Sequence, residues 1–222
     1  MMVPILAPVS TGVGVLRPAR VFITISEESM SQDLSSTVSL PASRHSNGVR
    51  QLALVLGGTA VLTASSYVSI PMQPVPVSLQ TFAVLMVGAL YGWRLGGLTV
   101  LAWLLEAALG MPVLAGGKGG LAPFFGPTAG YLLAFPLGAV LMGWLAARGW
   151  DGAHPLRAFG AMLLCTTLIL LLGGAWLGAM IGAAKGWQLG VLPFLVGDVV
   201  KSALGAATLA LWHTARSRLP RT

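Results

Sequence analysis

Residues 157–179 read RAFGAMLLCTTLILLLGGAWLGA, and no charged residue follows Arg157 in this stretch. A helix needs about 20 apolar residues to span the hydrocarbon core of a bilayer, so the stretch predicts a transmembrane helix. Of all 222 residues, 55% are hydrophobic and 9% are charged, with a mean hydropathy of +0.82. Soluble domains carry about 25% charged residues. So few charges cannot cover a water-exposed surface, and we expect the surface to face lipid.

Five further apolar runs flank this one, at about residues 50–67, 78–92, 95–109, 127–147 and 188–213. The second and third runs of the chain are short and joined by a tight link at residues 92–96, as in segments that other helices shelter. We therefore predict an all-α membrane domain of six transmembrane helices over residues 49–216. A basic cytoplasmic tail, residues 217–222, follows it.

The basic residues predict the orientation. With the N-terminus inside the cell, cytoplasmic segments carry eight arginines, and external loops carry only Lys118 and Lys185. The eight are Arg44, Arg50, Arg94, Arg148, Arg157, Arg216, Arg218 and Arg221. Such a bias marks the cytoplasmic side of membrane proteins, so both termini are expected to be cytoplasmic. It also explains the net charge of +7 without a nucleic-acid partner.

Residues 1–48 differ from the rest of the chain. They contain Glu27, Glu28 and Asp33, three of the six acidic residues, and a serine-rich stretch over residues 31–46. The apolar stretch at residues 3–15 is short, and a signal peptide's preceding positive charge and following cleavage site are not evident. We predict a disordered cytoplasmic extension. The alternative is that translation starts at Met30.

Three unusual segments fall outside the cell in this topology. Residues 69–80 contain three prolines, residues 110–128 are rich in glycine, and residues 182–190 are expected to form a short turn. The start of the last helix adjoins them. Groups able to bind a solute are therefore expected on one face of the membrane.

Three ionisable residues lie inside the predicted spans: Glu106, Asp198 and Lys201. Each costs about 2.5–3.5 kcal/mol at the bilayer centre, so such residues are commonly functional. Asp198 and Lys201 share one helix face and predict the polar wall of a ligand pocket. The alternative is a structural ion pair. Glu106 is expected either to contact ligand or to bind the loop backbone near the outer end of its span.

The segment Gly116-Gly117-Lys118-Gly119-Gly120 lacks the spacing of a phosphate-binding loop. It is expected to be either a close-fitting cap over a ligand, because glycine lets the backbone approach closely, or a flexible linker. Thr128 and Tyr131 open the fourth span on the same side. Tyr131 is expected either to contact ligand or to lie in the interfacial aromatic belt.

Enzyme signatures are not found in the sequence. His45, His154 and His213 lie at or beyond helix ends, with no nucleophile–base pair or metal-ligand set nearby. Cys165 is the only cysteine, which excludes an internal disulfide and a cysteine cluster. We predict a protein that is not an enzyme and that has no metal or cofactor.

Four segments together resemble the BioY family, the biotin-binding S components of energy-coupling factor (ECF) vitamin transporters. They are QPVPVSLQ (73–80), LEAALGMPVLAGGKGG (105–120), GPTAGY (126–131) and PFLVGDVVK (193–201). The resemblance covers about residues 50–216. The chain departs from the family's common residues at Trp103, Ala107, Leu114 and Ala129, with changes that are conservative for packing.

The resemblance implies an ECF S-component-like fold in the bacterial cytoplasmic membrane and a biotin pocket on its external side. The residues expected to bind substrate are Asp198, Lys201, Thr128, Tyr131, Gly116, Gly117, Gly119, Gly120, Glu106 and Gln80. The proline-rich loop at residues 71–76 would act as a lid. The implied partners are a membrane coupling protein and two ATPase subunits, with a second copy of the chain as a further possible partner.

Small residues of the first span would dock the coupling protein. They recur at a spacing of four: Ala53, Gly57, Ala60 and Ala64. Such spacing allows close helix contact, although in a chain rich in glycine and alanine it also arises by chance.

Three alternatives have distinct expectations. An ion-coupled secondary transporter of a small carboxylate solute would use Glu106 and Asp198 as proton or sodium sites, but no inverted repeat is evident. A membrane enzyme would need a catalytic pair or metal set in its spans. A structural subunit that binds no solute would not be expected to contain the Asp198 and Lys201 pair.

Overall fold

The computed structural model describes residues 5–7, 19–21 and 44–218, and the chain divides into two units, residues 1–47 and 48–222. In the first unit, β1 (Ile5–Ala7) pairs antiparallel with β2 (Ala19–Val21). Most of residues 1–48 lie outside the described residues. The predicted disordered extension therefore stays a prediction, as does the tail beyond residue 218.

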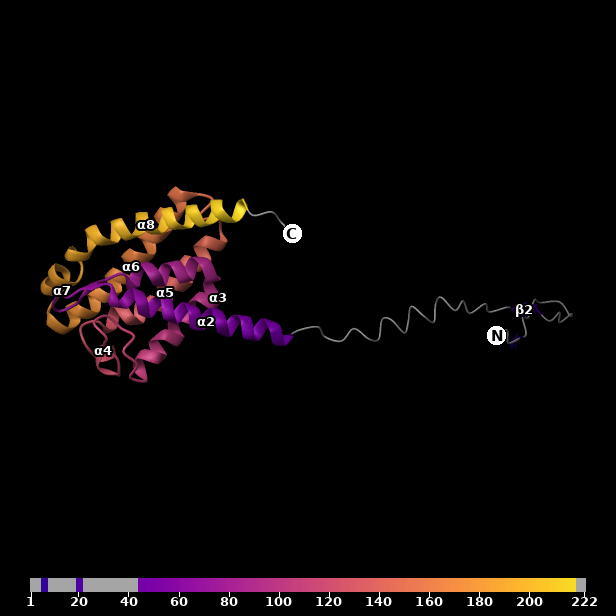
Figure 1. Cartoon of the computed structure of the whole chain (residues 1–222), viewed down its shortest axis with the longest axis horizontal. Helices are drawn as coiled ribbons and strands as arrows, with labels where there is room; N and C mark the ends of the chain where they lie inside the picture. The colour runs from indigo at the N-terminus through magenta and orange to yellow at the C-terminus, as the bar shows by residue number, and fades with distance from the viewer. Residues whose placement is uncertain (1–4, 8–18, 22–43, 219–222) are drawn as a thin grey trace, which may run out of the picture. The chain divides into compact units, whose positions relative to one another are not determined.

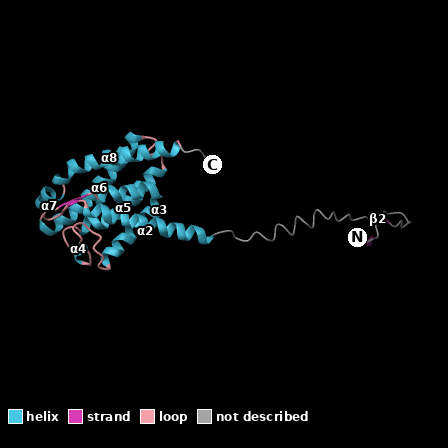
Figure 2. Ribbon diagram, in the orientation of Figure 1, coloured by secondary structure: helices cyan, strands magenta, loops and turns pink. Residues whose placement is uncertain are grey.

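The second unit is a bundle of long helices (Figures 1 and 2). These are α2 (Arg44–Tyr67), α3 (Gln80–Ala108), α5 (Ala129–Ala147), α6 (Pro155–Ile181) and α8 (Leu192–Ser217). The short elements are β3 (Ser69–Ile70), β4 (Val77–Ser78), α4 (Ala122–Phe125) and α7 (Ala183–Gly190). Among the described residues, five helical segments are long and apolar enough to cross a membrane.

The helix α3 contains two of the predicted spans. Gly92 interrupts it with φ 79° and ψ 168°, a conformation that favours glycine. A Cβ added at Gly96 would lie 2.8 Å from the Cα of Gly88, whereas a straight helix separates such residues by about 12 Å. The chain therefore reverses at Gly92, and residues 80–91 and 93–108 form two packed segments. With α2, α5, α6 and α8 they make six membrane segments, which confirms the predicted six-helix fold.

The core of this unit is apolar and close-packed. Leu62, Leu85, Trp103, Met142 and Met162 are each at most 1% exposed and bring α2, α3, α5 and α6 together. The helix α2 is the least enclosed of the spans, with 17% of its apolar window buried against 61% for α5. A broad face of α2 is therefore free for lipid or for a partner.

The segment from α6 to α8 differs from the prediction. Residues 182–190 were expected to be a turn, and the last helix was expected to begin near residue 188. Instead Ala183–Gly190 form α7, and α8 begins at Leu192. Gly186 packs directly on Gly178 of α6, so tertiary contact overrides the low helix propensity of the glycines. Pro193, in the first turn of α8, favours a new helix start because a helix needs no N–H there.

The ends of the bundle are distinct. The helices α4 and α7 lie at one end, while the N-terminal part of α2 and the C-terminal part of α8 lie at the other (Figure 1). This arrangement fits an even number of spans with the first and last ending on the same side. The assignment of that side to the cytoplasm rests on the arginine distribution and stays a prediction.

Candidate solute-binding site

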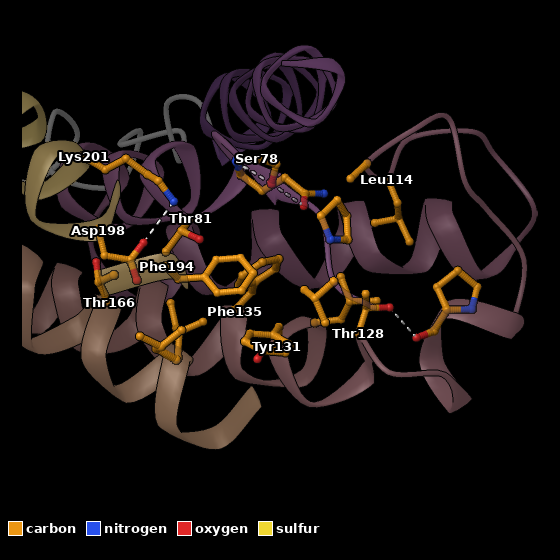
Figure 3. A pocket seen from close by; sticks show the side chains of 18 of the residues that line it. Ser78, Thr81, Leu114, Thr128, Tyr131, Phe135, Thr166, Phe194, Asp198 and Lys201 are labelled. Atoms are coloured by element: carbon orange, nitrogen blue, oxygen red, sulfur yellow. Dashed lines mark hydrogen bonds and ion pairs between the residues drawn. The ribbon is translucent and has the colours of Figure 1, made fainter. Parts of the chain in front are cut away.

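A cavity opens at the end of the bundle that carries α4 and α7 (Figure 3). It contains about 700 Å³ of space between atoms, part of it open to solvent. Six regions line it: the β3–β4 hairpin, the start of α3, the glycine-rich loop with α4, and the helices α5, α6 and α8. The lining residues are Val75, Pro76, Ser78, Gln80, Thr81, Leu114, Ala115, Lys118, Pro123, Thr128, Tyr131, Leu132, Phe135, Thr166, Ile169, Leu170, Phe194, Asp198 and Lys201.

Asp198 and Lys201 form an ion pair on the cavity wall. Lys201 Nζ donates a hydrogen bond to Asp198 Oδ1 at 3.0 Å, and the side chains are only 11% and 9% exposed, respectively. An ionised carboxylate offers about four acceptor positions and an ammonium group three donors, so the pair retains hydrogen-bonding capacity toward the cavity. The shared face predicted from their spacing is present. Their contact with a ligand remains a prediction.

Tyr131 and Thr128 line the cavity, but their hydroxyl groups bind the protein backbone. Tyr131 Oη donates to the carbonyl oxygen of Gly190 at 2.6 Å, and Thr128 Oγ1 donates to that of Pro123 at 3.2 Å. The Tyr131 ring lies beside Phe194, with centroids 6.2 Å apart and planes tilted by 34°. Tyr131 therefore presents mainly its ring to the cavity, and the bond from its hydroxyl ties α5 to the end of α7.

Gln80 also lines the cavity and connects three elements. Its Nε2 donates to Ser66 Oγ on α2 at 3.0 Å, and its Oε1 accepts a hydrogen bond from Ser78 Oγ on β4 at 2.9 Å. These bonds hold the end of the β3–β4 hairpin against α2. The proline-rich loop that was expected to act as a lid contributes Val75 and Pro76 to the lining. A role of this loop as a lid remains a prediction.

The glycine-rich loop reaches the cavity through the neighbours of its glycines. Leu114, Ala115 and Lys118 are lining residues, whereas the lining does not include the predicted Gly116, Gly117, Gly119 and Gly120. The backbone N–H of Leu114 donates to the carbonyl of Lys118 at 3.0 Å. Gly116 and Gly117 adopt φ 73° and 68°, so they form the tight turn between these two residues. The glycines shape the loop, and their contact with a ligand stays a prediction.

Two further bonds fasten this loop to the bundle. Tyr67 Oη, at the end of α2, donates to the carbonyl of Pro112 at 2.7 Å. The N–H of Gly120 donates to the carbonyl of Ala107 on α3 at 2.7 Å. These contacts fix the loop to the bundle, and its role as a cap over a ligand stays a prediction.

Glu106 lies apart from Asp198 and Lys201. It is half-buried on α3 and is not a lining residue of the cavity. Among the described residues its side chain has no ion pair, and its backbone carbonyl accepts a hydrogen bond from Met111 N–H at 3.1 Å. The structure thus does not bring the two intramembrane acids together at the cavity, and a role for Glu106 in binding stays a prediction.

Several lining residues were not singled out from the sequence, among them Thr81, Phe135, Thr166 and Phe194. Phe194 precedes Asp198 by four residues, so helical spacing could have placed it on the same face. Thr166 is a polar residue inside a continuous apolar run, and it lies beside Asp198 in Figure 3. Phe135 and Thr81 carry no signal that distinguishes them from ordinary core or helix-start residues.

The small-residue stripe of α2 faces away from the bundle. Ala53, Gly57, Ala60 and Ala64 are all exposed, and a Cβ added at Gly57 would meet nothing within 4 Å. The opposite side of the helix is packed, since Gly58, Leu62 and Ser66 are buried. The stripe is therefore accessible, while its use in docking stays a prediction.

These features define a class. The protein is a multi-pass, all-α membrane protein with a largely apolar cavity and a buried ion pair on the cavity wall. The model of the BioY family matches residues 31–218, and the chain belongs to this family. The match begins before the resemblance read from the sequence, which started near Arg50, and it confirms that resemblance.

Curated relatives and a solved structure agree with the assignment. The chain is 37% identical over 154 residues to the probable biotin transporter BioY of Pyrococcus horikoshii, covering 69% of this chain and 90% of the relative. It is 34% identical over 168 residues to the biotin transporter BioY of Thermotoga maritima, covering 73% and 95%. The crystal structure of an S-component for biotin from an ECF-type ABC transporter superposes with a TM-score of 0.69 at 26% identity, covering 78% and 95%.

Proposed function

We propose that this chain captures biotin with high affinity as the substrate-specific S component of an ECF-type transporter in the bacterial cytoplasmic membrane. The observation that carries the proposal is the buried pair of Asp198 and Lys201 on the wall of an otherwise largely apolar cavity, in a chain of the BioY family. Biotin combines a ureido ring, an apolar thioether ring, an aliphatic chain and a carboxylate. A cavity with a polar pair and an aromatic and aliphatic lining suits such a molecule.

The closeness of the pair favours one orientation of the ligand. Because Lys201 Nζ lies 3.0 Å from Asp198 Oδ1, both groups face the same part of a bound solute. The ureido ring offers N–H donors beside a carbonyl acceptor, so it can satisfy a carboxylate and an ammonium group together. The carboxylate of biotin carries no N–H or O–H group that could donate a hydrogen bond to Asp198. We therefore place the ureido ring at the pair and the aliphatic chain along Phe194, Tyr131 and Phe135.

Transport would need partners. We propose that an ECF coupling protein docks on the exposed stripe of α2, which lies on the side of this helix opposite its packed face. Two ATPase subunits bound to that coupling protein would hydrolyse ATP, and this chain would have no enzymatic role. A homo-oligomer is a further proposed form.

The second candidate, an ion-coupled secondary transporter of a small carboxylate solute, is less well supported. It would use Glu106 and Asp198 jointly, but Glu106 does not line the cavity. The family assignment also points to an S component.

Uptake of labelled biotin by biotin-requiring cells separates the two candidates. We expect expression of the full chain together with the coupling protein and ATPase subunits to support uptake at low external biotin. We expect that inactivating ATP hydrolysis in the partners abolishes it. Uptake that persists with inactive ATPases and collapses with the ion gradient would instead support the secondary transporter.

A further inference from the structure

A second hollow lies on the outside of the bundle, and its lining residues are all different from those of the cavity. Residues of α3, α5 and α6 line it: Trp93, Leu137, Val140, Leu141, Trp144 and Leu168. We call these six residues the lateral groove. Its lining is almost wholly apolar, and Trp93, Leu137 and Trp144 are 44%, 55% and 41% exposed. It therefore presents an open apolar trough to the membrane.

Two arginines lie at this groove. The guanidinium of Arg94 lies 4.7 Å from the ring centroid of Trp93, and that of Arg148 lies 3.6 Å from that of Trp144. Both tryptophans are groove residues, so both positive charges are fixed at its edge. Close packing produces this arrangement, because Gly143 contacts the backbone of Trp93 where α3 reverses. One guanidinium from α3 and one from Arg148, the residue that follows α5, thus each stack on a tryptophan that lines the same hollow.

The arginines keep their hydrogen-bonding capacity. Neither forms an ion pair with a carboxylate among the described residues. Stacking on an indole ring uses the face of a guanidinium, while its five N–H donors point outward in the plane. Such an edge binds phosphate oxygens with matching geometry.

The position along the membrane fits a lipid headgroup. Trp144 follows Thr128, a cavity residue, by 16 positions, or about 24 Å of helix. The groove thus meets the leaflet opposite the cavity, which is the cytoplasmic leaflet in the predicted topology. Tryptophan and arginine favour this depth, where anionic headgroups meet acyl chains.

We propose that the lateral groove binds an anionic glycerophospholipid of this leaflet. The phosphate lies between Arg94 and Arg148, and one acyl chain lies along Leu137, Val140 and Leu168. The occupant is a lipid because the site joins two phosphate-binding groups to an apolar trough at headgroup depth. The inference does not depend on biotin binding.

Native mass spectrometry of the full chain in mild detergent tests the proposal. We mix phosphatidylglycerol and phosphatidylcholine with identical acyl chains in equal amounts. The chain should retain phosphatidylglycerol in preference by about tenfold or more, since each arginine favours an anionic headgroup. The double variant Arg94→Gln/Arg148→Gln should lose this preference, and the control Arg216→Gln/Arg218→Gln should keep it. Equal retention of the two lipids by the unmodified chain would overturn the proposal, and so would an unchanged preference in the first variant.

A second variant tests the acyl trough with both arginines intact. Val140→Trp fills the groove and should lower phosphatidylglycerol retention severalfold, whereas Leu204→Trp on the exposed face of α8 should not. Unchanged retention of phosphatidylglycerol by the Val140→Trp variant would refute the placement of an acyl chain in the groove. Displacement of the lipid by excess inorganic phosphate would show a free-anion site instead. If the unmodified chain forms a dimer that only the Val140→Trp variant fails to form, the groove binds a second copy of the chain, which would also contradict the proposal.

Discussion

At the scale of single residues, the cavity depends on two charges buried together. An isolated charge at the bilayer centre costs about 2.5–3.5 kcal/mol, and the bond between Lys201 and Asp198 offsets part of this cost. The pair keeps free acceptor and donor positions, which a ligand can occupy without breaking it. A pair that served only to neutralise itself would not need to face a cavity.

The substitution Asp198→Asn tests this role. An amide offers one acceptor oxygen and an unwanted donor, and it leaves Lys201 buried without its counter-charge. A hydrogen bond to a charged group contributes about 1.5–3 kcal/mol, so losing the bond from the ligand to the Asp198 carboxylate should lower biotin affinity by about 10-fold to 100-fold. Calorimetric titration of the folded variant measures this. Asp151→Asn, at an exposed carboxylate in the loop after α5, is the matched control. Unchanged affinity in Asp198→Asn would remove this residue from the site.

The substitution Tyr131→Phe should show whether the Tyr131 hydroxyl stabilises the fold or binds the ligand. The variant keeps the ring at the cavity but loses the 2.6 Å bond to the carbonyl of Gly190. A buried acceptor left without its donor costs about 1–3 kcal/mol, so the midpoint of thermal unfolding should fall. Biotin affinity should change by less than about threefold, which is under 1 kcal/mol. A large loss of affinity with unchanged thermal stability would show that the hydroxyl binds the ligand.

At the scale of elements, the reversal of α3 at Gly92 positions much of the site. Residues 80–91 begin at Gln80 in the cavity wall, and residues 93–108 return to lead into the glycine-rich loop. Glycines allow the reversal to pack, since Gly143 of α5 lies against the carbonyl of Gly88. No larger side chain fits between these backbones.

Gly143→Ala should therefore destabilise the fold. Its Cβ would lie 2.7 Å from the carbonyl oxygen of Gly88, and overpacking of this kind costs about 1–3 kcal/mol. Gly160→Ala on α6 is the matched control, because its Cβ would meet only Trp150 at an ordinary 3.6 Å. We expect a lower thermal unfolding midpoint for Gly143→Ala and an equal or higher one for Gly160→Ala. The reverse order would show that α3 and α5 do not pack as described.

The sequence predicted the long elements well and the short ones poorly. Uninterrupted apolar runs over residues 127–147 and 157–179 have one physical solution, a spanning helix. Residues 182–190 contain glycines that are typical of a turn, and only the contact of Gly186 with Gly178 shows why a helix forms there. The pairing of β3 with β4 was likewise not predicted, since strands of two residues have no readable periodicity.

The candidate site was predictable where charge stood out against an apolar background. Asp198 and Lys201 were found for this reason, and both line the cavity. Phe135 lines it as well, but in a chain where over half of the residues are hydrophobic it cannot be told from core. The glycine-rich loop lies at the cavity, but the residues of it that line the cavity are Leu114, Ala115 and Lys118, and none of the four predicted glycines.

At the scale of the whole membrane domain, three surfaces are kept apart. The cavity lies at one end of the bundle, the two arginine–tryptophan pairs lie near the other, and the small-residue stripe lies along the free face of α2. Tyr67 and Ser66, at the end of α2, bind the glycine-rich loop and Gln80. The helix α2 therefore carries the surface proposed for the coupling protein and, through these bonds, also contacts the cavity wall.

The central claim is that the cavity binds biotin without help from partners. The most direct measurement is a calorimetric titration of biotin into the full chain, purified in detergent, alone and without ATP. We predict tight binding of one biotin per chain. A folded, monodisperse sample that shows no binding would contradict the biotin assignment.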